Sequence, residues 1–196
     1  MTPFRFASLA ALGLFMSSCG AISADRTLET TAMAWDHVPQ SQEWEARGFA
    51  ALDTHAAVLP DLVPADIDAW CPGYPDATEE ERAAFWLGLL SALARHESTW
   101  NERAVGGGGR WFGLVQISPA TARHYGCAAT SGDALLDGGA NVSCALRIWA
   151  TTVPRDGVIS EGTRGVAADW GPLHPSQASK REEIRNWVSS QAYCQS

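Results

Sequence analysis

The spacing of apolar residues along the chain predicts a mainly helical protein. Apolar positions recur at helical intervals in four segments, residues 40–58, 78–98, 141–151 and 180–190. Asp76 or Thr78 can cap the second segment, each with a Glu three residues later. Ser118 and Pro119 open a further helix as its cap and first residue. No segment shows the alternation of a strand, and the glycine run of residues 106–109 predicts a loop.

Glu97 stands at the end of the apolar stripe of the helix predicted for residues 78–98. Leu93, Leu90 and Trp86 precede it on the same helix face. Packing of that face would partly remove the carboxyl group from water, which disfavours the charged form and raises the pKa. A carboxylic acid that stays protonated near neutral pH can serve as a general acid. The alternative is a Glu at a frayed helix end that points into solvent.

Three ordered motifs begin at this residue. They are Glu97-Ser98, the stretch Gly113-Leu114-Val115-Gln116-Ile117 that leads into Pro119-Ala120-Thr121-Ala122, and Asp137 with Asn141-Val142. Over roughly residues 80–175 the chain thereby resembles the lytic transglycosylases with an SLT domain, a family related to goose-type lysozyme. The resemblance implies a lysozyme-like helical domain that binds and cleaves the glycan strands of peptidoglycan.

The chain departs from the family pattern near its C-terminal end. The family carries an Ala-Tyr-Asn-Ala-Gly-like stretch whose Tyr lies near the catalytic Glu, and the nearest match here places Asp169 or Trp170 at that position. Val115 also stands where Met is usual. The missing Tyr leaves open how the acid is positioned, which substrates are accepted and whether activity is reduced.

The resemblance implies that Glu97 alone catalyses cleavage of the MurNAc–GlcNAc bond with formation of a 1,6-anhydro ring, and no cofactor is implied. The candidate substrate-binding residues are Ser98, Gln116, Gly113, Trp111 and Asp169. Each also has a structural alternative: a helix-end hydroxyl, a loop brace, a turn, a core aromatic shared with Phe112, and a helix cap, respectively. Asn141 is expected to hold the loop that carries Gln116.

Two other functions are compatible with the sequence. A muramidase would use water as its nucleophile and would need a second carboxylate, for which Asp133, Asp137 and Asp169 are the candidates. A cell-wall-binding lipoprotein would have kept the fold and lost catalysis. The presence of Glu97 argues against this last function, and the missing Tyr argues for it.

The N-terminal segment has the pattern of a bacterial export signal. Arg5 precedes a ten-residue apolar run, residues 6–15, and Met16-Ser17-Ser18-Cys19 resembles a lipobox. We expect a signal peptide over residues 1–18, a lipidated N-terminus and tether over 19–39, and the lysozyme-like domain over 40–196. Cys19 would be the lipidated residue of an outer-membrane lipoprotein facing the periplasm. An ordinary cleavable signal and a soluble periplasmic protein are the alternative.

Charge and cysteine content narrow the possible partners. The net charge of −8 argues against nucleic acid. Besides Cys19 the chain has four cysteines, an even number that suggests two disulfides with three possible pairings. Cys127–Cys144, a short loop, and Cys71–Cys194, which would join the ends of the domain, are favoured. Without a Cys-x-x-Cys pair, and with Trp100 where a zinc protease needs His, no metal site is predicted.

Overall fold

The computed structural model describes Met1 and residues 31–195, and the folded domain begins before residue 40. Met33 and Trp35 are buried, and the Trp35 ring meets Trp44 edge to face at 5.6 Å between centroids. The tether predicted for residues 19–39 therefore ends earlier, because these apolar side chains belong to the core. The predicted signal peptide and Cys19 lie outside the described residues.

The described part of the chain is mainly helical, as predicted. The α-helices are α1 (Ser41–Leu52), α2 (Val58–Asp61), α3 (Glu79–Ser98), α4 (Pro119–His124), α5 (Gly132–Leu135), α6 (Gly138–Asp156) and α7 (Ala178–Ser189). Short 3-10 turns are η1 (Ile67–Ala69), η2 (Tyr74–Asp76), η3 (Gly165–Ala168), η4 (Gly171–Leu173), η5 (Pro175–Gln177) and η6 (Ala192–Cys194). One antiparallel pair, β1 (Val105–Gly106) and β2 (Trp111–Phe112), flanks the glycine run. These strands escaped prediction because two residues are too few to show an alternation.

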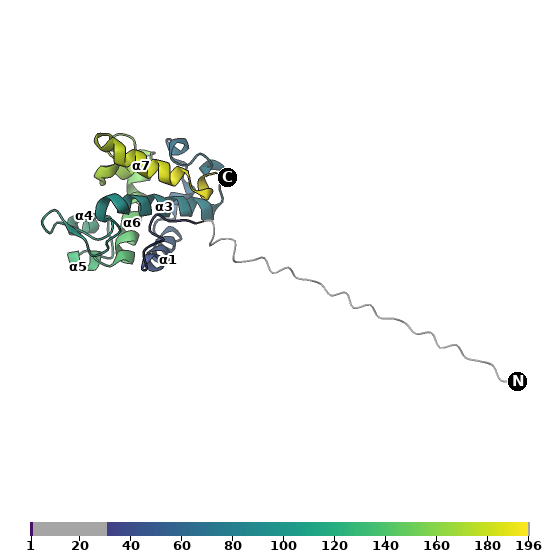
Figure 1. Ribbon diagram of the computed structural model, residues 1–196, viewed down its shortest axis with the longest axis horizontal. Coiled ribbons are helices and arrows are strands. Elements are labelled where there is room, and N and C mark those ends of the chain that lie inside the picture. The colour runs from purple at the N-terminus through teal and green to yellow at the C-terminus, as the bar shows by residue number, and fades with distance from the viewer. Residues whose placement is uncertain (2–30, 196) are drawn as a thin grey trace.

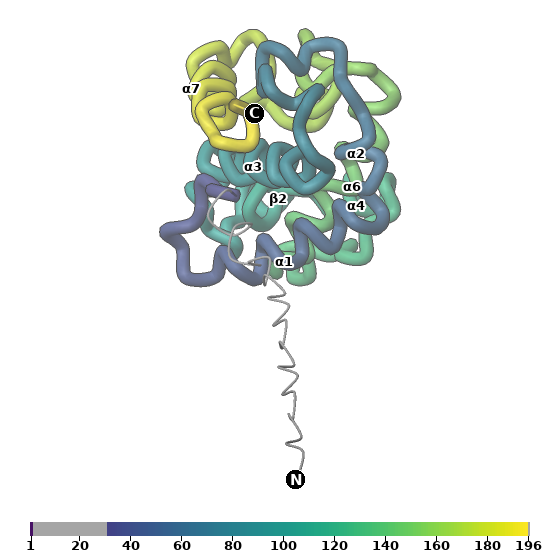
Figure 2. Tube along the Cα trace, turned by 90° about the vertical axis from the view of Figure 1, so that its right-hand side faces the viewer, coloured from purple at the N-terminus to yellow at the C-terminus, as the bar shows by residue number. Residues whose placement is uncertain are grey.

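Helix α3 is the central element of the domain. It packs against α7 on one side and α1 on the other, while α6 packs against α1 (Figures 1 and 2). Of the two predicted caps, Thr78 starts α3, where it forms a capping box with Glu81. Residues 83–94 of α3 are buried around the whole helix. This burial fixes the axis of α3, and with it the position of the residues at its C-terminal end.

Two predicted helices have different limits in the structure. The segment 40–58 divides into α1 and α2, because a series of turns separates Leu52 from Val58. Helix α6 begins at Gly138, three residues earlier than predicted, because the Asp137 side chain accepts a hydrogen bond from the Ala140 amide at 2.8 Å. A Cβ at Gly138 would lie 2.1 Å from the Trp44 indole nitrogen, so only glycine allows α6 to approach α1 here.

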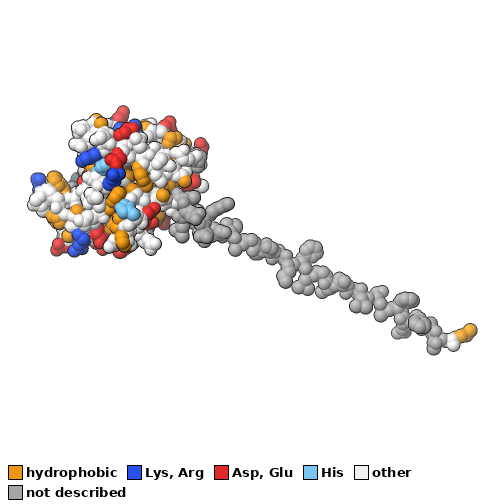
Figure 3. Space-filling view, in the orientation of Figure 1, with side chains coloured by type: hydrophobic (Ala, Val, Ile, Leu, Met, Phe, Trp, Pro, Cys, Tyr) orange, Lys and Arg blue, Asp and Glu red, His pale blue; other side chains and the backbone are white. Residues whose placement is uncertain are grey.

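Two disulfides join the pairs that the sequence favoured. Cys71 bonds to Cys194 with a Cα–Cα distance of 4.7 Å, and Cys127 bonds to Cys144 with a distance of 5.2 Å. On the face shown in Figure 3, acidic and basic side chains are interspersed. None of the described helices combines the length and the apolar composition needed to span a bilayer.

Candidate active site

A cleft of about 480 Å³ lies beside the C-terminal end of α3. One wall consists of His96 and Glu97 on α3, residues 106, 107 and 111 of the β-hairpin, and Gln116. The other wall consists of residues 169–172, which lead into η4, together with Gln177 and Lys180 at the start of α7. Of the three aspartates proposed as a second carboxylate, Asp169 lines this cleft, whereas Asp137 caps α6 and Asp133 lies in the first turn of α5.

The carboxyl group of Glu97 combines access to the cleft with partial burial. Burial raises the pKa of Glu97 from 4.5 to about 7, and the positive charge of Lys180 opposes part of this rise. Within the described residues the carboxyl group accepts no hydrogen bond, so its oxygens are open to a ligand. A carboxyl group with this pKa is protonated in a large fraction of molecules near neutral pH, as a general acid requires.

The backbone around Glu97 adopts conformations that non-glycine residues rarely take. Thr99 and Trp100, directly after α3, have φ values of 55° and 57°, and Gln116 across the cleft has 53°. The Trp100 indole nitrogen donates to the Ser91 carbonyl at 2.9 Å and holds the turn against α3. Such strain persists where the surrounding packing enforces it, as it often does at functional sites.

Ser98 joins α3 to the loop that carries Gln116. Its hydroxyl donates to the Leu114 carbonyl at 2.8 Å and lies 3.4 Å from the Ala94 carbonyl. The hydroxyl is thus already engaged by backbone on two sides. Ser98 therefore positions the loop relative to Glu97, a role different from the substrate contact considered for it.

Asn141 holds the same loop from beneath, as expected. Its side chain accepts from the Val115 amide at 3.0 Å and donates to the carbonyls of Phe112 and Leu135 at 2.9 and 3.0 Å. At Gly113, where φ is 80°, a Cβ would lie 2.2 Å from the Leu135 carbonyl oxygen. The glycine is needed for this close packing on Leu135 and Asn141, and the structure places it away from the cleft lining.

Gln116 lines the cleft but also braces its own loop. Its amide nitrogen donates to the Gly113 carbonyl at 2.9 Å and to the Ala104 carbonyl at 3.2 Å. Its amide oxygen faces Gly106, where an added Cβ would approach it to 2.1 Å. The side chain thus fixes the hairpin against the loop at the edge of the cleft.

Trp111 is a surface residue of the hairpin. It is 42% exposed and lines the cleft, so it lies outside the core, whereas its neighbour Phe112 packs against Gly132. The Arg110 guanidinium lies 4.7 Å from the centre of the Trp111 ring. A Cβ at Gly107 would lie 2.2 Å from the same ring. The glycine run therefore allows the hairpin to close tightly on Trp111.

The residues that replace the family's Tyr take two different positions. Trp170 is buried, and its indole nitrogen donates to the Val115 carbonyl at 2.8 Å, which ties the two walls together. Asp169 is exposed at the cleft and accepts a hydrogen bond from the Tyr125 hydroxyl at 3.0 Å. No sequence motif singled out Tyr125, because it lies in an unrelated segment at the end of α4.

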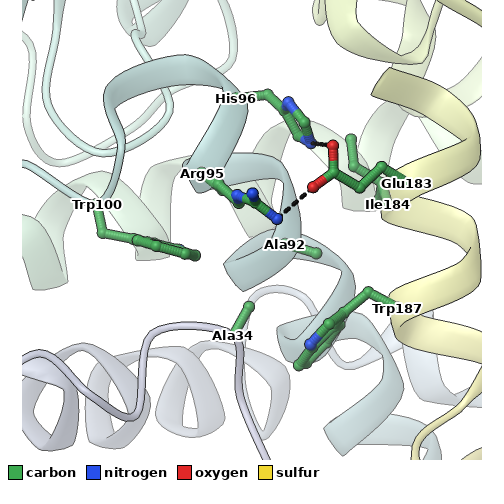
Figure 4. Close-up of a pocket in the computed structure, with 8 residues that line it drawn as sticks. All are labelled: Ala34, Ala92, Arg95, His96, Trp100, Glu183, Ile184 and Trp187. Atoms are coloured by element: carbon green, nitrogen blue, oxygen red, sulfur yellow. Dashed lines mark ion pairs between the residues drawn. The ribbon is translucent and has the colours of Figure 1, made fainter. Parts of the chain in front are cut away.

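An ionic contact between α3 and α7 fixes the second wall. Arg95 and His96 of α3 both face the Glu183 carboxylate of α7, with the His96 imidazole at 3.6 Å (Figure 4). They border a small cavity of about 70 Å³ between the helices. Burial lowers the pKa of His96, and Glu183 opposes this change. Lys180 lies one helical turn before Glu183 and so faces the cleft beside Glu97, which its sequence context alone did not indicate.

Comparison with known proteins identifies the class to which this fold and cleft belong. Residues 77–154 match the family model of the transglycosylase SLT domain. The chain therefore belongs to the proteins with a transglycosylase SLT domain. The match ends before the second wall of the cleft, which contributes Asp169, Trp170 and Lys180.

Solved structures of the protein DslA resemble this domain closely. Wild-type DslA is 29% identical, with a TM-score of 0.75, and the similarity covers 83% of this chain and 97% of DslA. Two DslA variants with a Glu replaced by Gln are 28% and 29% identical, with TM-scores of 0.75 and 0.74, and cover 83% and 81% of this chain and 97% and 94% of theirs. No curated protein matches the sequence significantly.

Proposed function

We propose that the protein is a peptidoglycan lytic transglycosylase in which Glu97 is the only catalytic acid and base. The observation that carries the proposal is a partly buried carboxyl group, with a pKa of about 7, at the cleft of an SLT domain. Ser98, Asn141 and Trp100 hold the backbone around it in one arrangement. This rigidity suits an acid that must meet a glycosidic oxygen in one geometry.

In the proposed reaction one proton passes through Glu97 in both directions. The protonated carboxyl group donates to the oxygen of the MurNAc–GlcNAc bond as that bond breaks. The resulting carboxylate then accepts the proton of the C6 hydroxyl of the same MurNAc, whose oxygen attacks C1 and closes the 1,6-anhydro ring. No water is consumed, and the nucleophile belongs to the substrate, so the attack gains from its high effective molarity.

A muramidase is the second candidate, favoured by one feature of the second wall. Asp169 lines the same cleft as Glu97, and the Tyr125 hydroxyl orients its carboxylate. A hydrolase needs a carboxylate in such a place to activate water or to stabilise the transition state. The two reactions differ by one water in their products, so they can be distinguished directly.

Digestion of purified murein sacculi followed by mass spectrometry tests the proposal. A transglycosylase releases fragments with 1,6-anhydroMurNAc ends, which are lighter by one water than hydrolysed fragments. Reducing MurNAc ends would show a muramidase. Sacculi that bind the protein without release of soluble fragments would show a cell-wall-binding protein without catalysis.

We also propose that the protein is exported and lipidated at Cys19. Support comes from the lipobox-like sequence and from two disulfides, which form and persist in oxidising compartments. Two or more acyl chains anchor a protein stably to a membrane. Metabolic labelling with a fatty-acid analogue should mark the wild type and leave Cys19→Ala unlabelled, whereas equal labelling of both would refute the lipidation.

A further inference from the structure

Lys180 has an unusual place for a lysine. It is the only lysine of the chain, and the structure puts it in the cleft that Glu97 lines. It lies in the first turn of α7, at the positive end of the helix dipole, where a cation is electrostatically unfavourable. The side chain is half-buried. Helix stability therefore does not explain a lysine at this position.

The acidic groups around Lys180 have other partners. Glu183, one turn further along α7, is engaged by Arg95 and His96. Asp169 on the same wall accepts from Tyr125. Within the described residues no hydrogen bond or ion pair involves the Lys180 ammonium group. A cation held at a cleft without a partner is available for an anionic group of a ligand.

We propose that Lys180 determines substrate specificity by pairing with a carboxylate on the glycan strand and so places the scissile bond at Glu97. This inference rests on the proposed function. Murein offers carboxylates from two sources, the lactyl group of a MurNAc that has lost its peptide and the stem peptide of one that has kept it. A glycan without carboxylates has no group for this contact.

The pairing also favours the reactive form of the acid. The charge of Lys180 opposes protonation of Glu97, and a substrate carboxylate neutralises that charge. The other titratable groups at the cleft are His96 and Asp169, with Glu183 behind His96. Loss of the Lys180 charge should therefore weaken substrate binding and, at the same time, extend activity to higher pH. A merely structural role for Lys180 would not produce the second effect.

Lys180→Gln removes the charge, and Lys180→Arg keeps it as the matched control. The substrates are intact sacculi, sacculi freed of peptide by an amidase, and the peptide-free glycan with its carboxylates converted to methylamides. On glycans with carboxylates we expect Lys180→Gln to raise KM about ten-fold, the effect of losing one charge-assisted hydrogen bond, and to move the alkaline limb of the pH profile upward. On the methylamide glycan the variant and the wild type should have the same KM.

The peptide-free glycan identifies the source of the carboxylate. A KM effect there assigns the lactyl carboxylate, and an effect confined to intact sacculi assigns the stem peptide. Unchanged KM on every substrate, or an equal rise on the methylamide glycan, would overturn the proposal. If the wild type releases no fragments, the proposed function fails, and sedimentation of the same variants with the same insoluble glycans still tests the contact.

Chemical modification offers a second test, because a single lysine is present. Acetic anhydride removes the Lys180 charge, whereas reductive methylation retains it. Acetylated wild type should behave like Lys180→Gln, and methylated wild type should behave like untreated protein. Acetylated Lys180→Arg reports any contribution of the N-terminal amine. Loss of binding after methylation to the same extent as after acetylation would show that bulk rather than charge matters, which contradicts the proposal.

Discussion

The two walls of the cleft are built in different ways. The wall that carries Glu97 lies within the residues matched by the SLT family, and buried hydrogen bonds from Asn141 and Ser98 fix its backbone. The opposite wall lies outside that match and consists of 3-10 turns and the first turn of α7. Its charged side chains, Asp169 and Lys180, reach the cleft from this less regular scaffold.

This difference separates proton transfer from substrate selection. An acid must be placed accurately, and a rigid helix end with its supporting loop provides that accuracy. Charges that select a substrate tolerate more variation, so they can be exchanged on the opposite wall without disturbing the acid. The link from Trp170 to the Val115 carbonyl and the contact of Glu183 with His96 keep the two walls at a fixed separation.

The largest expected effect is that of Glu97→Gln on the first wall. Removal of a general acid should lower kcat on sacculi by ~10²–10⁴-fold, because Gln keeps the shape and loses the proton. Asp169→Asn is the matched change on the opposite wall, and a transglycosylase should retain most of its activity with it. Fragment release measured by mass spectrometry checks both, and near-wild-type activity of Glu97→Gln would end the catalytic assignment.

The second effect concerns how each disulfide supports the domain. Cys127–Cys144 closes a short loop of sequence separation 17, whereas Cys71–Cys194 closes one of 123 and joins the C-terminal part to the segment before α3. Loop entropy predicts contributions of roughly 3 and 5 kcal/mol, respectively. Replacing each pair by alanine and measuring the free energy of unfolding in urea should reproduce this order. The reverse order would show that the length of the closed loop does not decide how much each disulfide stabilises the domain.

Much of the first wall could be predicted from the sequence. The apolar stripe of Trp86, Leu90 and Leu93 predicted both a helix and an acid with a raised pKa at its end, because both depend on local spacing. Ser118 at a cap and the favoured cysteine pairs are likewise local or combinatorial signals. The structural alternatives for Ser98 and Gly113 were open, since a hydroxyl or a glycine looks the same in sequence whether it meets backbone or ligand.

The second wall could not be predicted, because contacts between distant segments create it. Lys180 faces Glu97 only because Glu183 meets Arg95 and His96 across two helices. Asp169 is oriented by Tyr125, 44 residues earlier. Neither pairing leaves a periodic or compositional trace. The start of the domain was missed for a related reason, since Trp35 is recognisable as core only once its partner Trp44 is known.

A smaller effect is expected from Trp111→Ala on the hairpin. The exposed ring lines the cleft, so its removal should raise KM for glycan about five-fold, which corresponds to about 1 kcal/mol of binding free energy. Because little of the ring is in the core, the free energy of unfolding should stay within about 0.5 kcal/mol of the wild type. Trp111→Phe keeps an aromatic face and should recover part of the affinity. A large loss of stability with unchanged KM would instead assign Trp111 a structural role.

The smallest effect is a pH dependence of stability that comes from Glu97 alone. Its pKa in the folded protein, about 7, lies above the ordinary value of 4.5, so the folded state holds the proton more tightly than the unfolded state. The free energy of unfolding therefore falls as pH rises through this interval, and the loss is complete above pH 7. Glu97→Gln cannot ionise and escapes this loss. Its Tm should equal that of the wild type near pH 4, where both side chains are neutral, and exceed it at about pH 8. The measurement at the acidic pH is the internal control, because a difference already present there would reflect packing rather than charge. Equal Tm values at the alkaline pH would show that the ionised carboxylate is well solvated in the cleft, and the first wall would then lack the burial on which its acid depends.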